Sequence, residues 1–395
     1  MQRILHSSDW HLGKPFAGFE GDLPSRLREA RHGVIGRLAA EARRSGARLV
    51  LVAGDIFDAE TPAPQVPAQA LAAMAEAADL TWALLPGNHD PARPGGLWER
   101  IAADRPGNLV ALTEAAPVEA LPGLWLLPSP LGSRDPGRDP TLWMDTAETP
   151  EGALRVGIAH GAVHEFDTGR VHSAAIAPDR PARAGLDYLA LGDWHSALQV
   201  GPRVWYSGTP EPDRFGLPGA GSCLAAALPG GGGVPEVERV PVARFAWIEA
   251  EERLAPGAGA AAETEILRHL PEGMARRDVL LRLALTGRAR LPDRAAWEAA
   301  AERLAPALAR LELDLAGLEI AVEAEDLDRI GRGGALRAAA ETLRAEAEDA
   351  ALDAPARQAA REALDMLYGW CVEEETATGE TDTGETAGGA AGGGR

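Results

Sequence analysis

The amino-acid sequence predicts a mixed α/β protein whose first part is a layered sandwich of sheets and helices. Over residues 1–241, short apolar runs alternate with helical patterns, which is typical of buried strands joined by helices. The later part of that segment contains more strands and more Pro and Gly turns, which favours stacked sheets over one open sheet. Of the 395 residues, 46% are hydrophobic and 25% are charged, as in ordinary globular proteins.

The elements of this first domain follow one another closely along the chain. They are a strand over 3–6, a helix over 24–45, a strand over 48–53, a helix over 67–78, a strand over 81–85, and strand-like runs at 156–160, 188–191 and 204–206. Because buried strands in such domains end in functional loops, the residues after each strand are candidates for chemistry.

A second, smaller α/β domain is predicted over residues 242–330. Residues 279–285 and 318–322 alternate in polarity with a period of two, which is typical of strands with one polar face. Helical patterns cover residues 261–270 and 293–313.

The last part of the chain is predicted to be helical and then disordered. Residues 331–372 form a segment with two helices, at about 334–350 and 355–371. Residues 373–395 consist largely of Glu, Thr and Gly with almost no apolar side chain, so they cannot offset the entropy cost of folding.

Charge and cysteine content exclude several classes of protein. The 39 Lys and Arg against 59 Asp and Glu give a net charge of −20, which argues against a chain that coats nucleic acid over its whole surface. Two distant cysteines, Cys223 and Cys371, exclude a disulfide framework or a thiolate zinc site. No apolar run suits a membrane span or a signal peptide, so a cytoplasmic protein without membrane contact is expected.

Five short motifs, each after a predicted strand, carry oxygen or imidazole ligands. They are Asp9-Trp10-His11, Gly54-Asp55-Ile56-Phe57-Asp58, Gly87-Asn88-His89-Asp90, His160-Gly161 and Gly192-Asp193-Trp194-His195. Each alone is more often a turn or a core histidine, but their joint occurrence favours a metal centre. Gly54 and Gly87 would allow sharp turns there. Carboxylate, amide and imidazole groups without thiolate suit Mn, Fe or Zn.

The order of these motifs resembles that of the calcineurin-like metallophosphoesterases. Within that superfamily, residues 8–14 (SDWHLGK), 53–58 (AGDIFD) and 206–211 (YSGTPE) are similar to the SbcD-type DNA repair exonuclease subunits. The resemblance covers about residues 1–216 by motif. It implies a four-layer αββα sandwich with a two-metal centre.

The resemblance also implies which residues bind the two divalent ions, for which Mn²⁺ is preferred and Fe or Zn are alternatives. One ion would be held by Asp9, His11, Asp55 and His195, and the other by Asp55, Asn88, His160 and Asp193. Asp55 would bridge the two ions. Asp193 departs from the family, which commonly has His at this position, and it adds a negative charge.

Further residues are expected to support the reaction. By the resemblance, His89 is the catalytic histidine that stabilises developing charge or protonates the leaving group, while the ions polarise a phosphodiester and activate water. Asp58 and Asp90 are expected to orient imidazoles. Lys14, which is the only lysine, and Arg93 are expected to meet a substrate phosphate, although chance placement explains Lys14 equally well.

Partners are expected from the later part of the chain. Six arginines of the second domain cluster locally: Arg268, Arg276, Arg277, Arg282, Arg288 and Arg290. They would contact DNA, as the capping domain of SbcD-like proteins does, or they would form a solvated face whose charge balances nearby Glu side chains. By the resemblance, residues 331–372 would dock on an SbcC-like coiled-coil ATPase, or they would pack on their own domain. A homodimer is a further expectation from the resemblance.

The sequence therefore predicts a manganese-dependent phosphodiesterase that is the DNA exonuclease subunit of an SbcCD-like repair complex. Endonuclease activity is a further option. Two alternatives remain open at this point. One is a calcineurin-like phosphatase that acts on a phosphoester other than DNA, and the other is a weakly active scaffold subunit for a coiled-coil ATPase.

Overall fold

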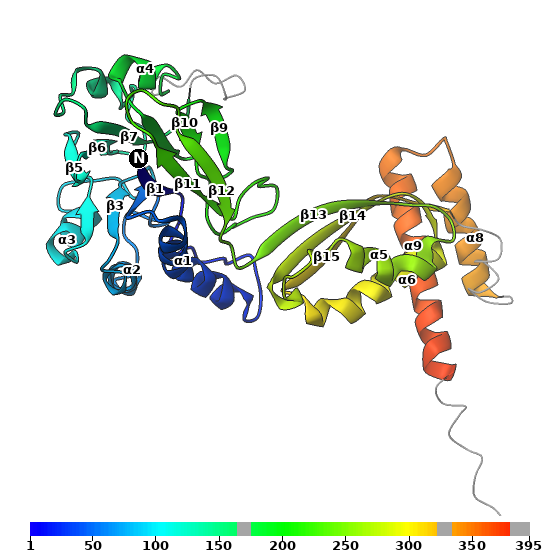
Figure 1. The fold of residues 1–395 in the computed structure, drawn as a ribbon. Helices are drawn as coiled ribbons and strands as arrows, with labels where there is room; N and C mark the ends of the chain where they lie inside the picture. The colour runs from blue at the N-terminus through cyan, green and yellow to red at the C-terminus, as the bar shows by residue number, and fades with distance from the viewer. Residues whose placement is uncertain (164–174, 322–333, 380–395) are drawn as a thin grey trace, which may run out of the picture. The chain divides into compact units, whose positions relative to one another are not determined.

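The computed structural model describes residues 1–163, 175–321 and 334–379 of the chain, which divides into two units, Met1–Trp247 and Ile248–Arg395 (Figure 1). The division falls a few residues after the position predicted from the sequence, 241/242, and lies within the strand Ala246–Leu254. The second unit includes the segments predicted as a capping domain and as a helical tail.

The first unit contains two six-stranded sheets (Figure 1). The first sheet has the order β12-β11-β1-β2-β3-β4, in which β1 to β4 are parallel and β11 and β12 add an antiparallel edge. Its strands are β1 (Gln2–Ser7), β2 (Leu49–Ala53), β3 (Thr81–Leu85), β4 (Leu109–Ala111), β11 (Ser222–Leu228) and β12 (Glu236–Pro241).

The second sheet has the order β5-β6-β7-β8-β10-β9, with β6, β7, β8 and β10 parallel. Its strands are β5 (Val118–Leu121), β6 (Leu124–Ser129), β7 (Leu154–His160), β8 (Tyr188–Gly192), β9 (Leu198–Gly201) and β10 (Val204–Tyr206).

The two sheets stack between helices to give four layers. Strand β2 is buried on both faces: Val50 and Val52 pack against α1, whereas Leu49 and Leu51 face the second sheet. The outer layers are α1 (Leu23–Ser45), α2 (Gln65–Glu76) and α3 (Leu97–Asp104) on the first sheet, and η1 (Leu142–Thr146) and α4 (Arg180–Ala184) on the second. The predicted αββα sandwich is confirmed.

The second unit is built on a three-stranded sheet, β13-β14-β15, in which β14 and β15 are parallel. Its elements are β13 (Ala246–Leu254), η2 (Ala258–Ala261), α5 (Ala262–Arg268), η3 (Arg276–Asp278), β14 (Val279–Arg290), α6 (Leu291–Leu304), η4 (Ala305–Ala307), β15 (Arg310–Ala321), α8 (Ala335–Glu348) and α9 (Ala354–Gly379).

Two boundaries in this unit differ from the sequence prediction. The helix predicted over 293–313 ends at Leu304, because Pro306 cannot continue it, and residues from Arg310 onward belong to β15. Helix α9 continues to Gly379, past the start of the tail predicted to be disordered at residue 373; residues 380–395 lie outside the described part. Among the described residues, no helix combines the length and the apolar content needed to cross a membrane.

A buried carboxylate, Asp293, links the start of α6 to the preceding loop. Its oxygens accept hydrogen bonds from the backbone amides of Gly257 (2.8 Å), Gly259 (3.1 Å) and Arg290 (3.1 Å) and from the Arg290 guanidinium. Burial alone would raise the pKa of Asp293, but these donors outweigh it and lower the pKa to about 2.

We expect Asp293→Ala to lower the free energy of unfolding of the second unit by about 1–2 kcal/mol at neutral pH, as for loss of a helix N-cap. Because the folded-state pKa is below the unfolded value of 3.8, this stabilisation is present above about pH 4 and is lost as the pH falls toward 2. Urea unfolding of the full chain against pH measures it. The exposed residue of the same helix, Glu302→Ala, serves as control, and an equal effect of both variants would contradict the assignment.

Candidate metal centre

The five predicted motifs meet at one edge of the sandwich. Each lies at or just after the carboxyl end of a parallel strand, with three at β1, β2 and β3 of the first sheet and two at β7 and β8 of the second. Carboxyl ends of parallel strands share one edge, so residues distant in the sequence converge there. In Figure 1 the two sheets lie face to face, which brings the two sets of strand ends together.

All seven predicted ligands lie in one connected cluster. The separations that join them are His195 Nε2 to Asp9 Oδ1 (4.0 Å), His195 Nε2 to His11 Nε2 (3.2 Å), His11 Nε2 to Asp55 Oδ2 (3.8 Å), Asp55 Oδ2 to His160 Nε2 (3.4 Å), His160 Nε2 to Asp193 Oδ1 (3.7 Å) and Asn88 Nδ2 to Asp193 Oδ1 (3.1 Å). Asp55 lies between the two predicted ligand sets, as expected for a bridging carboxylate.

The protonation pattern of the imidazoles makes their Nε2 atoms available as ligands. His160 Nδ1 lies 2.8 Å from the carbonyl oxygen of Ala53. A carbonyl only accepts hydrogen bonds, so Nδ1 carries the hydrogen in neutral His160 and Nε2 carries the lone pair. This Nε2 is buried without a hydrogen-bond partner and points toward Asp55 and Asp193, as a metal ligand would.

His11 and His195 give the clearest indication that a cation belongs in the site. Their Nδ1 atoms face carboxylates, with His11 Nδ1 3.4 Å from Asp58 Oδ1 and His195 Nδ1 3.7 Å from Asp213 Oδ1. With hydrogens on both Nδ1 atoms, two lone pairs face each other across the 3.2 Å between the Nε2 atoms. A cation coordinated by both nitrogens relieves that repulsion, as does a proton on His195, whose pKa is raised because Asp213 and Asp9 outweigh the effect of burial. Carboxylate-oriented histidines are typical of metal sites.

The electrostatics of the cluster also favour positive charge. Burial alone would lower the pKa of His160, but Asp55 and Asp193 outweigh it and hold the pKa well above its usual value. Burial keeps the pKa of His11 below its usual value, so this imidazole is the better neutral ligand. The residues present therefore fit divalent ions bound by carboxylate, amide and imidazole groups.

The loops hold four of the ligands in strained backbone conformations. Asp9, His11, Asp55 and Asp193 have φ angles of 55°, 45°, 54° and 96°, in a region that non-glycine residues seldom adopt. Backbone hydrogen bonds from Asp9 N to Gly54 O (3.0 Å) and from His11 N to Asp55 O (2.9 Å) tie the first two loops together. Such strain at a site indicates function.

Glycines in the motifs make room for the ligands. A Cβ atom at Gly87 would lie 2.2 Å from Asp55 Oδ1, and one at Gly192 would lie 1.9 Å from the Ala53 carbonyl oxygen. Gly54 has a φ of +88°, and a Cβ there would lie 2.2 Å from His160 Nδ1. Gly54 therefore permits the turn that the sequence predicted, whereas Gly87 is needed because of close packing against Asp55.

The structure places His89 beside the ligands. Its Nδ1 donates to the carbonyl oxygen of Asp58 at 3.0 Å, its backbone amide donates to Asp55 Oδ1 at 2.9 Å, and its ring lies 4.7 Å from that of His11. The ring is half-buried. Because Nδ1 is engaged by a carbonyl, Nε2 is the nitrogen available to exchange a proton.

The two predicted orienting carboxylates have different surroundings. Asp58 lies beside His11, where it can orient the imidazole. Asp90 instead accepts hydrogen bonds from the backbone amides of Gly87 (2.7 Å) and Phe57 (3.0 Å). The prediction that it orients an imidazole is therefore corrected, because its carboxylate holds together the two loops that carry predicted ligands.

The predicted phosphate-contacting cations form ion pairs with carboxylates. Arg93 Nη2 lies 3.1 Å from Glu60 Oε1, and Lys14 Nζ lies 2.6 Å from Asp213 Oδ2. Their contact with a phosphate remains a prediction. Sequence reasoning did not identify Asp213, although it lies two residues after the segment 206–211 and pairs with the only lysine of the sequence.

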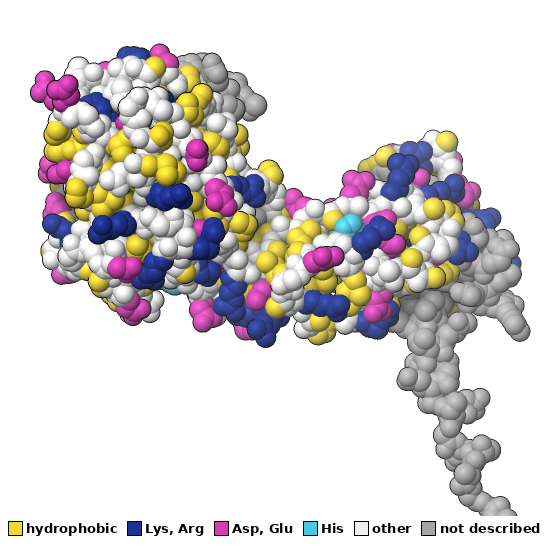
Figure 2. Space-filling view, in the orientation of Figure 1, with side chains coloured by type: hydrophobic (Ala, Val, Ile, Leu, Met, Phe, Trp, Pro, Cys, Tyr) yellow, Lys and Arg dark blue, Asp and Glu magenta, His cyan; other side chains and the backbone are white. Residues whose placement is uncertain are grey.

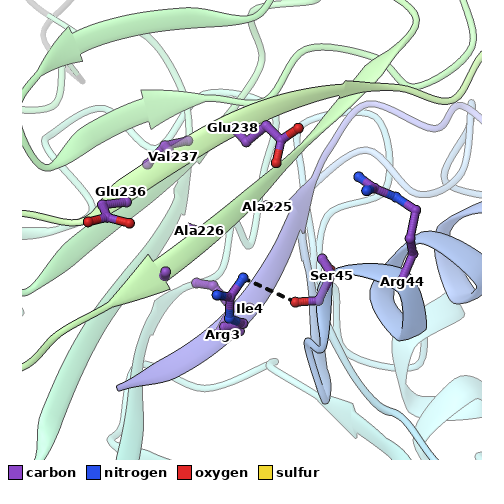
Figure 3. A pocket seen from close by; sticks show the side chains of 10 residues that line it. Arg3, Ile4, Arg44, Ser45, Ala225, Ala226, Glu236, Val237 and Glu238 are labelled. Carbon is purple, nitrogen blue, oxygen red and sulfur yellow. Dashed lines mark hydrogen bonds between the residues drawn. The ribbon is translucent and has the colours of Figure 1, made fainter.

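A separate hollow of about 300 Å³ lies between β1, β11, β12 and the end of α1 (Figure 3). Arg3 donates there to the Ser45 carbonyl oxygen at 3.3 Å, and Glu236 and Glu238 line the opposite wall. None of the predicted ligands lines this hollow. It is therefore distinct from the metal centre.

Comparisons with known proteins add a family to this geometry. Residues 2–177 match the family described as calcineurin-like phosphoesterase, which supports a metallophosphoesterase domain in the first unit and indicates hydrolysis of phosphoester bonds. The crystal structure of TT1561 of Thermus thermophilus matches with a TM-score of 0.37 and 13% identity, covering 60% of this chain and 98% of that chain. No curated protein matches the chain.

We expect Asp213→Ala to weaken binding of divalent metal by about 10- to 100-fold, because His195 loses the carboxylate that orients its ring. Equilibrium dialysis with Mn²⁺ measures the affinity and the number of ions bound. Asp79→Ala removes an exposed carboxylate that pairs with Arg43, and it serves as control. Equal metal affinity of the Asp213 variant and the parent chain would show that His195 is oriented without this carboxylate.

Proposed function

We propose that this chain is a two-metal phosphodiesterase that hydrolyses DNA as an exonuclease subunit, with Mn²⁺ as the preferred ion. The proposal rests on the convergence of seven side chains of metal-ligand type. Within this cluster, three imidazole Nε2 atoms face carboxylates or one another. The resemblance of segments 8–14, 53–58 and 206–211 to SbcD-type nucleases favours DNA over other phosphoesters.

In this proposal the chain holds the ions with the two ligand sets already described, which share Asp55. Two bound divalent ions supply Lewis-acid polarisation of the phosphate and activation of the nucleophile. His89 provides the proton at the leaving oxygen through Nε2, because its Nδ1 is engaged by Asp58 O. Asp55 keeps the loop of His89 in place by accepting its backbone amide.

The arginines of the second unit divide into two groups. Arg268, Arg282 and Arg290 pair with acidic neighbours, as expected for a solvated, charge-balanced face. Arg276, Arg277 and Arg288 are exposed. On the face of this unit shown in Figure 2, basic and acidic side chains are interspersed. We assign the proposed DNA contacts to Arg276 and Arg288 of the exposed group, whose binding would be independent of sequence and sensitive to salt.

The activity proposal is tested by assaying the full chain with Mn²⁺ on bis(p-nitrophenyl) phosphate, p-nitrophenyl phosphate, and single- and double-stranded DNA. We expect cleavage of DNA and of the diester, and a decrease of about 10²- to 10⁴-fold in kcat for His89→Ala with metal binding retained. His32→Ala, a half-buried histidine on α1, serves as control.

The other outcomes of this assay discriminate between the alternatives. Cleavage of the monoester alone would contradict the nuclease proposal and favour a phosphatase. A complete lack of Mn²⁺-dependent hydrolysis on the four substrates would favour a scaffold subunit.

We also propose that α8 and α9 dock on an SbcC-like coiled-coil ATPase and that the chain acts as a homodimer in that complex. Leu343, Leu364 and Leu367 pack with Leu291 of α6, so part of the apolar face is covered by the second unit itself. Leu336 and Met366 are exposed on the same helices, at 51% and 56%, and leave apolar surface for a partner.

We expect the double variant Leu336→Glu and Met366→Glu to lose co-elution with the coiled-coil ATPase, because charged side chains cannot be buried in an apolar interface. The exposed Leu142→Glu of the first unit is the control. Size-exclusion chromatography with light scattering reports both the complex and the dimer. Undiminished co-elution of the double variant would overturn this docking surface.

A further inference from the structure

A cavity of about 330 Å³ adjoins the second ligand set. Asn88, His160 and Asp193 line one end, so a phosphate held at the metal centre would border the cavity. Leu131 and Pro136 line another part of its wall. The volume lies in the range of small-molecule sites, whereas a phosphate group alone would fill only a small part of it.

The loop that forms this wall is tied to the metal-binding loops. The amide of Ala92, just after the Gly87–Asp90 motif, donates to the carbonyl oxygen of Leu131 at 2.7 Å. Leu131 is buried. Further along the loop, Asp135 Oδ1 accepts the amide of Gly137 at 2.8 Å, which engages that carboxylate in its own turn. The wall therefore has a defined position relative to the ligands.

Arg134 is the basic residue that lines the cavity. Its side chain is 68% exposed, and its Nε lies 3.8 Å from Glu60 Oε1, the same oxygen that Arg93 Nη2 approaches at 3.1 Å. The guanidinium groups of Arg93 and Arg134 thus share the single carboxylate of Glu60, so these three side chains together carry one net positive charge. A guanidinium in this setting can bind phosphate oxygens or stack on a base.

We propose that this cavity binds one nucleoside monophosphate unit of the substrate strand, with the sugar and base against Leu131 and Pro136 and with Arg134 on a phosphate next to the scissile one. The inference rests on the proposed function and deepens it, because it assigns the residue that distinguishes a nucleotide from a bare phosphate. Small-molecule sites combine apolar walls with a few placed polar groups; here the lining includes Leu131 and Pro136 together with Arg134 and the carboxylates of Asp135 and Asp193.

The test is isothermal titration of the full, Mn²⁺-saturated chain with thymidine 3′,5′-bisphosphate, which carries one phosphate for the metal centre and one for Arg134, and with inorganic phosphate. We expect the nucleotide to bind at least tenfold more tightly than inorganic phosphate. Arg134→Gln should remove about tenfold of that nucleotide affinity and leave phosphate affinity unchanged. Arg138→Gln, an exposed arginine of the same loop that does not line the cavity, should change neither.

Equal binding of the nucleotide and inorganic phosphate, or equal effects of Arg134→Gln and Arg138→Gln, would overturn the inference. So would a lack of nucleotide binding both with and without Mn²⁺. These readouts do not depend on turnover. A chain that binds nucleotide through Arg134 but does not cleave DNA would retain the subsite and contradict the proposed nuclease activity, so the two failures are distinguishable.

Discussion

The facing Nε2 atoms of His11 and His195 impose the strongest constraint on this protein. They lie 3.2 Å apart, and each ring presents its other nitrogen to a carboxylate, Asp58 or Asp213. When both imidazoles are neutral and carry their hydrogens on Nδ1, two lone pairs repel each other at that distance. A bound metal ion relieves this repulsion, and so does a proton on His195: burial alone would lower the pKa of His195, but Asp213 and Asp9 outweigh it and raise the pKa. The strand ends of the first unit therefore bring together groups that a cation between them stabilises.

The backbone is strained at four of the predicted ligands, and the packing of the sandwich offsets the free energy of that strain. Each left-handed ligand residue costs about 1–3 kcal/mol and persists only where its surroundings determine it fully. Asp90 provides part of that support by holding the amides of Gly87 and Phe57 from a fully buried position. Burial and the nearby charge of Asp55 hold the pKa of Asp90 well above its usual value, so this support is itself linked to the metal-binding carboxylates.

A buried ionic network supports the loop that carries Asp213. Arg31 of α1 is fully buried and donates to the carbonyl oxygens of Trp10 and Glu211. Although burial alone would raise the pKa of Asp213, His195, Arg31 and Lys14 together hold it well below its usual value, so this carboxylate is ionised. The first helix thus connects the loop of the first motif to Glu211, two residues before the carboxylate that faces His195, so the candidate metal centre is supported by packing beyond its predicted ligands.

The sequence by itself predicted the layered sandwich from strand periodicity, which is a local pattern. Motifs such as D-x-H predicted a metal centre, and their resemblance to a known family implied the ligand sets. The sequence could not determine the partners of those residues. Lys14 and Asp213 are 199 positions apart and meet only when β1 and the segment after β10 share one edge. Likewise, Asp90 looked like an orienting residue for a histidine until the fold placed two backbone amides against it, and the leucines after Pro306 fitted a helix until β14 offered a parallel neighbour. The tertiary structure decided these points, since they depend on contacts between distant segments.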